Sequence, residues 1–182
     1  DPSCGVYTRQ TFMVTERYKI WTMQSLWHNL PVANGCQQLS EYDEGGGYDA
    51  CADAFSFNEK STNISFAKAY PETAGLENIN RSINISDDGI NLCDNFAFKN
   101  EENSICEHFI TAFDVKIDGS RVILGDEFVL EADGCDITVD RISFDGDTKL
   151  TTYWKTDGLN RIKCSFTCEK EKSIKFVLFV KG

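Results

Sequence analysis

The sequence predicts an all-β fold, namely an antiparallel up-and-down β-barrel with a short N-terminal helix, stapled by disulfide bonds. Three observations predict it. Aromatic and β-branched residues alternate with polar ones over many short segments. Eight cysteines are spread over the whole chain. Turn-forming dipeptides separate the segments, with Asn-Gly at 34–35 and Asp-Gly at 88–89, 118–119, 133–134, 145–146 and 157–158.

The turn dipeptides predict how the strands are connected. Asp and Asn before Gly tolerate the positive φ angles that tight hairpins require. The last four Asp-Gly pairs lie 15, 12 and 12 residues apart. This spacing is typical of consecutive strands joined by hairpins.

Segments with period-two alternation give the expected strands, which are 18–25, 50–57, 62–70, 79–85, 90–98, 109–117, 162–168 and 174–180. The only helix expected is a short one over 7–14, because no other segment has an apolar stripe of helical period. Closure into a barrel would remove exposed strand edges, and a two-sheet sandwich is the alternative.

Size and charge limit the classes of function. The 182 residues fit one domain, 1–182, and no apolar run is long enough to cross a bilayer. The net charge of −11 disfavours nucleic acid and anionic membranes as partners. The same charge would concentrate a cationic ligand or a basic protein, or serve solubility alone. We expect a monomer.

Cysteines and sequons predict secretion. The even set of cysteines contains no C-x-x-C pair and so favours disulfides over zinc, although its connectivity stays open. The disulfide candidates are Cys4, Cys36, Cys51, Cys93, Cys106, Cys135, Cys164 and Cys168. N-x-S sequons mark Asn63, Asn80 and Asn84 for N-glycosylation. The first residues, Asp1-Pro2-Ser3-Cys4, are typical of a mature chain, so we expect that a signal peptide has been removed.

Catalytic groups are scarce, so we expect a binding protein, not an enzyme. His28 and His108 are the only histidines, and no nucleophile elbow, zinc-protease helix or catalytic-cysteine motif occurs. The carboxylates of Asp136, Asp140, Asp145 and Asp147 lack the spacing of a calcium loop, so we expect solvated turn residues. No cofactor and no metal are expected.

Two segments resemble the tick salivary lipocalins. The stretch Thr15 to Ser25, followed by Cys36, is similar to the first barrel strand of that family and the cysteine after it. Gly134-Cys135-Asp136-Ile137, Tyr153 to Asp157 and Cys164 resemble its later strands at similar spacing. Two features depart from the family pattern, because 173–181 predicts a strand where the family has a helix, and the carboxylate that amine-binding members place before the late tryptophan is replaced by Thr152.

The resemblance implies an eight-stranded barrel, secreted to modulate host immune or inflammatory responses, that binds a small hydrophobic molecule such as a sterol, fatty acid or eicosanoid. A buried cationic amine needs a paired carboxylate, and the one expected before Trp154 is missing. A histamine or serotonin scavenger is therefore kept only as the alternative to a hydrophobic ligand. A second alternative is capture of a host cytokine or complement factor by the acidic surface. The residues expected to line the ligand site are Trp21, Met23, Trp27, Phe57, Phe66, Phe98, Phe113 and Trp154.

Overall fold

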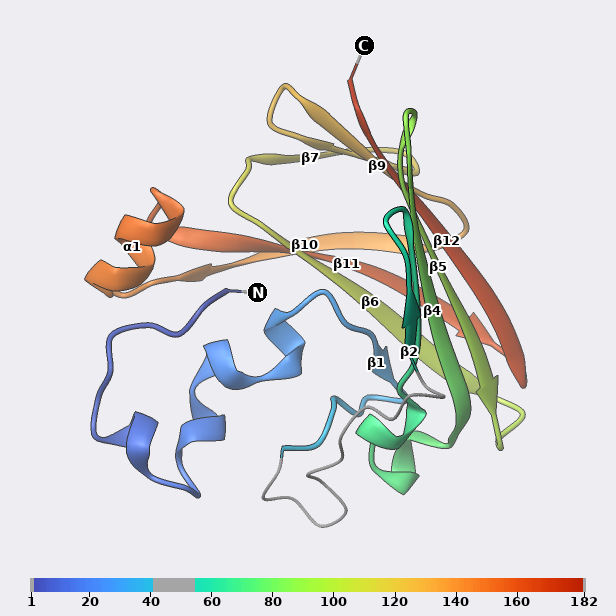
Figure 1. Cartoon of the computed structure of the whole chain (residues 1–182), viewed down its shortest axis with the longest axis horizontal. Coiled ribbons are helices and arrows are strands. Elements are labelled where there is room, and N and C mark those ends of the chain that lie inside the picture. Colours follow the sequence, from blue (N-terminus) through green and yellow to red (C-terminus); the bar gives the residue numbers. More distant parts are fainter. Residues whose placement is uncertain (1, 41–54, 182) are drawn as a thin grey trace.

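A computed structural model describes residues 2–40 and 55–181, which form two antiparallel sheets packed face to face (Figure 1). Sheet A has four strands in the order β1-β6-β11-β10, and sheet B has eight in the order β2-β3-β4-β5-β12-β9-β8-β7. The prediction of a mostly β, antiparallel protein is confirmed. The helical elements are 3-10 turns and one short α-helix, and no described helix has the length and hydropathy of a membrane span.

The strands of sheet A are β1 (Val32–Ala33), β6 (Asn103–Thr111), β10 (Asp136–Ser143) and β11 (Gly158–Cys168). Those of sheet B are β2 (Phe55–Phe57), β3 (Ser61–Ser65), β4 (Leu76–Ser86), β5 (Gly89–Phe98), β7 (Val115–Asp118), β8 (Arg121–Leu124), β9 (Phe128–Ala132) and β12 (Glu171–Val180). The helical elements are η1 (Gln10–Phe12), η2 (Arg17–Lys19), η3 (Trp21–Met23), η4 (Ser25–Trp27), η6 (Ala67–Ala69), η7 (Glu72–Ala74) and α1 (Thr148–Trp154).

The two sheets do not close into a barrel, so the barrel prediction is wrong and the sandwich alternative describes the fold. The physical reason is that the chain changes sheets within segments that the sequence pattern treats as continuous. The expected strand 109–117 is split at a corner, with β6 in sheet A and β7 in sheet B. Asn160 fixes this corner, because its amide donates to the carbonyl of Phe113 at 2.8 Å.

The turn prediction is correct for two hairpins, β4–β5 and β7–β8, but the turn at 133–134 links strands of different sheets and Asp145-Gly146 precedes α1. Asp-Gly pairs join β4 to β5, β7 to β8 and β9 to β10, and their glycines have positive φ. At the Asn34–Gly35 turn both residues have positive φ, as a type I′ turn requires. Gly158 is different, since it begins β11 and packs closely against the backbone of Ile142.

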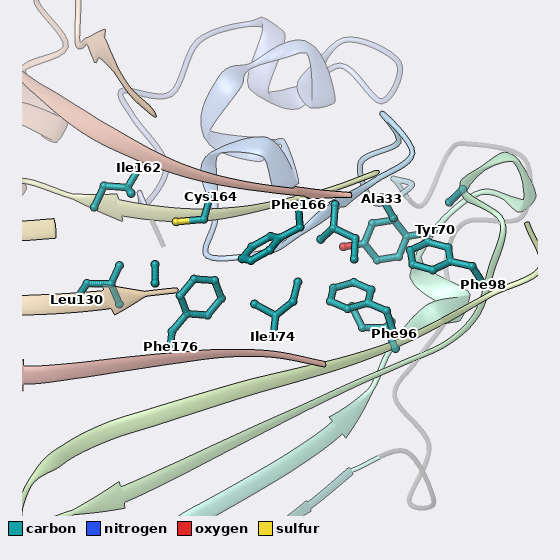
Figure 2. Close-up of a cluster of buried hydrophobic side chains, with 14 of the residues drawn as sticks. Ala33, Tyr70, Phe96, Phe98, Leu130, Ile162, Cys164, Phe166, Ile174 and Phe176 are labelled. Atoms are coloured by element: carbon teal, nitrogen blue, oxygen red, sulfur yellow. The ribbon is translucent and has the colours of Figure 1, made fainter. Parts of the chain in front are cut away.

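The hydrophobic core lies between the sheets, where large side chains meet from both sides (Figure 2). Ile162 and Phe166 on β11 face Ile174 and Phe176 on β12, and the rings of Phe166 and Phe176 pack edge to face at 6.2 Å. Phe98, expected to line a ligand cavity, is 2% exposed in this core. The aromatic alternation therefore fills a core instead of surrounding a ligand.

The N-terminal segment covers the outer face of sheet A (Figure 1). The strand expected over 18–25 is wrong, because successive 3-10 turns occupy this stretch and the helix expected over 7–14 is reduced to η1. Met23 N–H donates to Ile20 O at 2.9 Å, the i to i+3 pattern of such turns. Trp21 packs on Phe144, so tertiary contacts override the local strand pattern.

The described cysteines, Cys4, Cys36, Cys93, Cys106, Cys135, Cys164 and Cys168, are all free thiols, so the disulfide staples expected of the fold are not formed between them. Cys51 lies outside the described residues. An even number of cysteines did not translate into pairs at bonding distance among the described residues, because strand register decides which side chains meet. Cys93 and Cys106, for example, point to the outer faces of different sheets.

A buried charge cluster, Arg81–Asp94–Glu107, joins the two sheets. Arg81 on β4 donates through Nε to Asp94 on β5 at 2.8 Å, and through Nη2 to Glu107 on β6 at 3.0 Å. The Asp94 and Glu107 side chains have no exposed area. Burial, and then the charge of Asp94, raise the pKa of Glu107, which favours a neutral carboxyl beside one ion pair.

We expect Arg81→Ala to lower the free energy of unfolding by about 3–5 kcal/mol, because it leaves the buried Asp94 carboxylate without a counter-ion. Urea denaturation followed by tryptophan fluorescence measures the change. Arg121→Ala is the matched control, since its pair with Glu131 lies at the surface and should contribute less than about 1 kcal/mol. Equal losses in the two variants would contradict the role given to the buried cluster.

Candidate functional site

A pocket of about 520 Å³ lies between the N-terminal turns and the segment 37–40. This volume is within the range of small-molecule sites. We call it the N-terminal pocket, and its walls are formed by Val14, Thr15, Tyr18, Lys19, Met23, Gln24, Ser25, His28, Leu30, Gln37, Gln38, Leu39 and Ser40.

Hydrogen bonds between side chains and backbone hold the 3-10 turns in the shape of the pocket. The Gln24 amide donates to the carbonyl of Tyr18 at 3.1 Å. His28 Nε2 lies 3.2 Å from the carbonyl of Thr22, and Ser25 Oγ accepts from the Gln38 N–H at 3.0 Å. The 3-10 turns and the 37–40 segment are thus tied to each other across the pocket.

The polar groups of the pocket are mostly uncharged. Amides and a hydroxyl come from Gln24, Gln37, Gln38 and Ser25. Burial lowers the pKa of His28, so this side chain is neutral at pH 7. Lys19 is the charged lining residue, and its Nζ pairs with Glu16 at 2.7 Å. Apolar contact surface is supplied by Tyr18, Met23, Leu30 and Leu39.

One buried polar atom of the pocket lacks a partner. Gln37 Oε1 is inaccessible to solvent and accepts no hydrogen bond in the described structure. An unpaired buried carbonyl costs about 1–3 kcal/mol unless a ligand or ordered water donates to it. Because the atom is inaccessible, a hydrogen-bond donor on a ligand would reach it only if the Gln37 side chain turned toward the pocket that it lines.

Residues 26–31, which we call the strap, form one wall of the pocket and are anchored on their inner side by the buried charge cluster. Arg81 Nη1 donates to the carbonyl of Asn29. The Tyr70 hydroxyl donates to the carbonyl of Pro31 at 2.6 Å, and the phenol oxygen also bonds to the side chain of Gln38. Burial, and then the neighbouring Glu107, raise the pKa of Tyr70, so the phenol stays protonated and donating.

A second polar cluster anchors the strap on the outer face of sheet A. Arg161 donates to both carboxylate oxygens of Asp140, at 3.0 and 2.7 Å, and to the carbonyl of Leu26 at 3.1 Å. Its guanidinium also stacks on Trp27 at 4.1 Å. His108, the neighbour of Glu107 on β6, lies buried beside this cluster with Nδ1 unpartnered. Asp140 is thus a structural partner of Arg161.

The residues expected to line a ligand site do not gather at one cavity. Met23 lines the N-terminal pocket, whereas Trp27 is stacked on Arg161 and Phe66 on Arg81. Phe57 and Phe113 are exposed at 74% and 43%. Trp21 and Trp154 join the small outer core of sheet A, where the indole N–H of Trp154 donates to the carbonyl of Pro2 at 3.0 Å.

The pocket amides were missed by sequence reasoning, which followed the aromatic residues. A usable signal was the pair Gln37-Gln38 directly after the Asn34–Gly35 turn. Charged residues at inward positions of strands, Arg81 and Asp94, were a signal for the buried cluster. No group of His, Cys, Asp or Glu able to hold a metal is present among residues 2–40 and 55–181.

Comparisons with known proteins identify solved structures with a similar fold but do not assign the chain to a family. No protein-family profile matches the chain, and no curated protein matches it. A solved structure of a heparinase III gene product matches with a TM-score of 0.66 at 11% identity, covering 100% of this chain and 27% of that one. The heparan sulfate lyase HepC from Pedobacter heparinus matches with a TM-score of 0.59 at 10% identity, covering 99% of this chain and 28% of that one.

These likenesses show a shared fold with one part of each larger protein. The chain spans about a quarter of the length of the structures it matches. They correct the resemblance to tick salivary lipocalins, since the neighbours have the heparinase III type of fold and the sheets here stay open. They also give no support to the expectation that the chain is not an enzyme, because both neighbours are enzymes.

We expect the stability of the protein to fall between pH 6.5 and 4 because of His108. Burial, and then Arg161, lower its pKa to about 4. The unfolded chain therefore binds a proton in this range that the folded chain does not, and acid favours unfolding. The wild type should lose on the order of 2 kcal/mol relative to His108→Gln over that range, measured by urea denaturation at each pH.

Lys116→Gln is the control, since it replaces an exposed side chain on β7 of the other sheet. The difference in free energy of unfolding between Lys116→Gln and the wild type should be constant with pH. If the difference in free energy of unfolding between His108→Gln and the wild type were also constant with pH, the buried, neutral state of this histidine would be contradicted.

Proposed function

We propose that the chain is a binding module for a small, neutral, polar molecule of the saccharide type, held in the N-terminal pocket. The observation that carries the proposal is the lining of this pocket, where uncharged amides, a hydroxyl and a neutral histidine alternate with apolar surface. Sugars present hydroxyls around their edge and C–H groups on their faces, so they require both kinds of contact. The Gln37 amide, whose Oε1 has no partner in the free protein, would turn toward the pocket to accept from a ligand hydroxyl.

The same lining argues against the ligands expected from the sequence. A sterol or fatty acid would leave the Gln37 carbonyl without a partner, at about 1–3 kcal/mol, whereas the amides of Gln24 and Gln38 already bond to Tyr18 and Tyr70. A cationic amine would need a carboxylate, and none is present among the lining residues that the structure describes. A neutral polar ligand avoids both costs.

The structural neighbours make a saccharide a reasonable class. One of them is named a heparinase, and the other is named a heparan sulfate lyase. Heparan sulfate is a polyanion, however, and this chain has a net charge of −11. Long-range repulsion disfavours such a ligand, so the proposal is restricted to uncharged saccharides.

Binding is favoured over catalysis by the position of the titratable groups. Tyr70 and Glu107 are buried between the sheets, where a substrate cannot reach them. In the pocket, His28 Nε2 is engaged by the carbonyl of Thr22. General acid–base catalysis needs groups within hydrogen-bond reach of the substrate, and the titratable lining residues are His28, Tyr18 and Lys19, the last of which is paired with Glu16.

A second candidate function is capture of a basic protein, favoured by an exposed apolar patch with an acidic edge. Phe57 and Ile85 are 74% and 53% exposed at one end of sheet B. Asp87 and Asp88 follow Ile85 in the β4–β5 turn and are also exposed. Phe57→Ser with Ile85→Ser should abolish binding of a basic amphipathic test peptide, and unchanged binding would remove this candidate.

We expect the purified protein to bind a member of a panel of neutral gluco-, xylo- and chito-oligosaccharides in isothermal titration calorimetry. Gln37→Met should weaken that affinity about tenfold, because the ligand loses its hydrogen bond to the Gln37 amide. The free protein should lose no more than about 1 kcal/mol of stability, since Oε1 has no partner to lose.

Lys116→Met on β7 is the control and should leave the affinity unchanged. Binding restricted to fatty acids, sterols or histamine would overturn the proposal. Cleavage of an oligosaccharide during the titration, seen as new reducing ends, would replace the binding module with an enzyme.

A further inference from the structure

The outer face of sheet B carries no charged residue over three adjacent strands, between the bulge at Glu77 and the β4–β5 turn. Register pairs set the outward positions, since Arg81 opposite Asp94 points inward and the neighbours of both point outward. The outward residues of β3, β4 and β5 are Ser61, Asn63, Ser65, Asn78, Asn80, Ser82, Asn84, Ser86, Asn91, Cys93, Asn95 and Ala97. In a chain with 26% charged residues, a face made mostly of Asn and Ser is unusual.

All three N-glycosylation sequons project from this face. An N-x-S sequon has a spacing of two, so on a strand its Asn and Ser share one side. Asn63 is paired with Ser82, Asn80 with Ser65, and Asn84 with Ser61, which places the sequons of β3 and β4 against each other. Nothing in the sequence pattern alone requires that three sequons point the same way.

The asparagine side chains are accessible for modification. Asn63 and Asn84 are exposed, and Asn80 is half-buried. Asn80 Nδ2 donates to Ser65 Oγ at 3.1 Å. A glycosylated amide keeps one N–H, so this bond can persist after a sugar is attached. In Figure 1, β4 and β5 lie on the side of the molecule away from the N-terminal segment.

A hollow lies beside Asn80. It has a volume of about 330 Å³, and its walls include Asn78, Asn95 and Ser173 together with the charged Glu171 and Lys172. Asn95 is the register partner of Asn80, so the hollow begins directly next to the amide. The first sugar of a glycan on Asn80 would find hydrogen-bonding groups on these three side chains.

We infer that the outer face of β3 and β4 is a glycan-bearing face, with N-linked oligosaccharides on Asn63, Asn80 and Asn84. The donor is an oligosaccharide on a polyprenyl pyrophosphate. The amide nitrogen forms a bond to sugar C1 while the C1–O bond to the pyrophosphate breaks. The lipid pyrophosphate leaves with that electron pair, and the amide loses one proton. The glycans cover this face and leave the N-terminal pocket open.

Secretion of the full chain from a eukaryotic cell line behind a signal peptide tests this inference. Intact mass spectrometry should show three glycans, and Asn63→Gln, Asn80→Gln and Asn84→Gln should each remove one. Asn95→Gln, on the same face outside any sequon, is the control and should remove none. Because the glycans stand on an open face, peptide N-glycosidase should release them from the folded protein without denaturant.

Secreted, folded protein with these asparagines unmodified would overturn the inference, as would glycans released only after denaturation. Binding of a free polysaccharide to this face in protein made without glycans, lost in Asn63→Gln with Asn95→Gln, would make the face a recognition surface and also overturn it. The triple Gln variant should keep the affinity of the N-terminal pocket, so the inference and the proposed function fail independently.

Discussion

The ion cluster of Arg81, Asp94 and Glu107 is the constraint on which the rest of the structure depends. It is the place where strands β4 and β5 of one sheet meet β6 of the other through polar contacts inside an apolar core. Such a cluster is costly unless its charges are paired, and Arg81 pairs with both carboxyls, while Glu107 Oε1 has no partner in the described structure. The sheets must therefore stack with these residues in contact.

The same cluster connects the core to the pocket. Arg81 uses its remaining N–H groups on the carbonyl of Asn29, and Tyr70 holds Pro31 two residues further along. On the other side of β6, Arg161 holds Leu26 and Trp27. A strap fixed from both faces of a sheet provides a rigid wall without regular secondary structure, and a preorganised wall lowers the entropic cost of binding a ligand.

The sequence allowed prediction of the strands but not of their closure. Asp-Gly turns and alternation locate β4, β5, β11 and β12 because both signals are local. The change of sheet near Phe113 depends on Asn160, a residue 47 positions away, and no local pattern carries it. The pocket was missed for a similar reason, since Gln37 and Gln38 form a pocket only because the fold places them next to the turns at 18–28. The even number of cysteines led to a wrong prediction of disulfide bonds between the described cysteines, because pairing depends on the register of the strands that carry them.

Side-chain amide chemical shifts test the central claim most directly, namely that the anchored pocket is where the protein binds. During titration with a neutral oligosaccharide, the NMR signals of the Gln24, Gln37 and Gln38 amides should shift together, and those of Asn91 and Asn95 on the outer face of sheet B should not. Shifts confined to Asn91 and Asn95, with the three glutamines unmoved, would contradict the account.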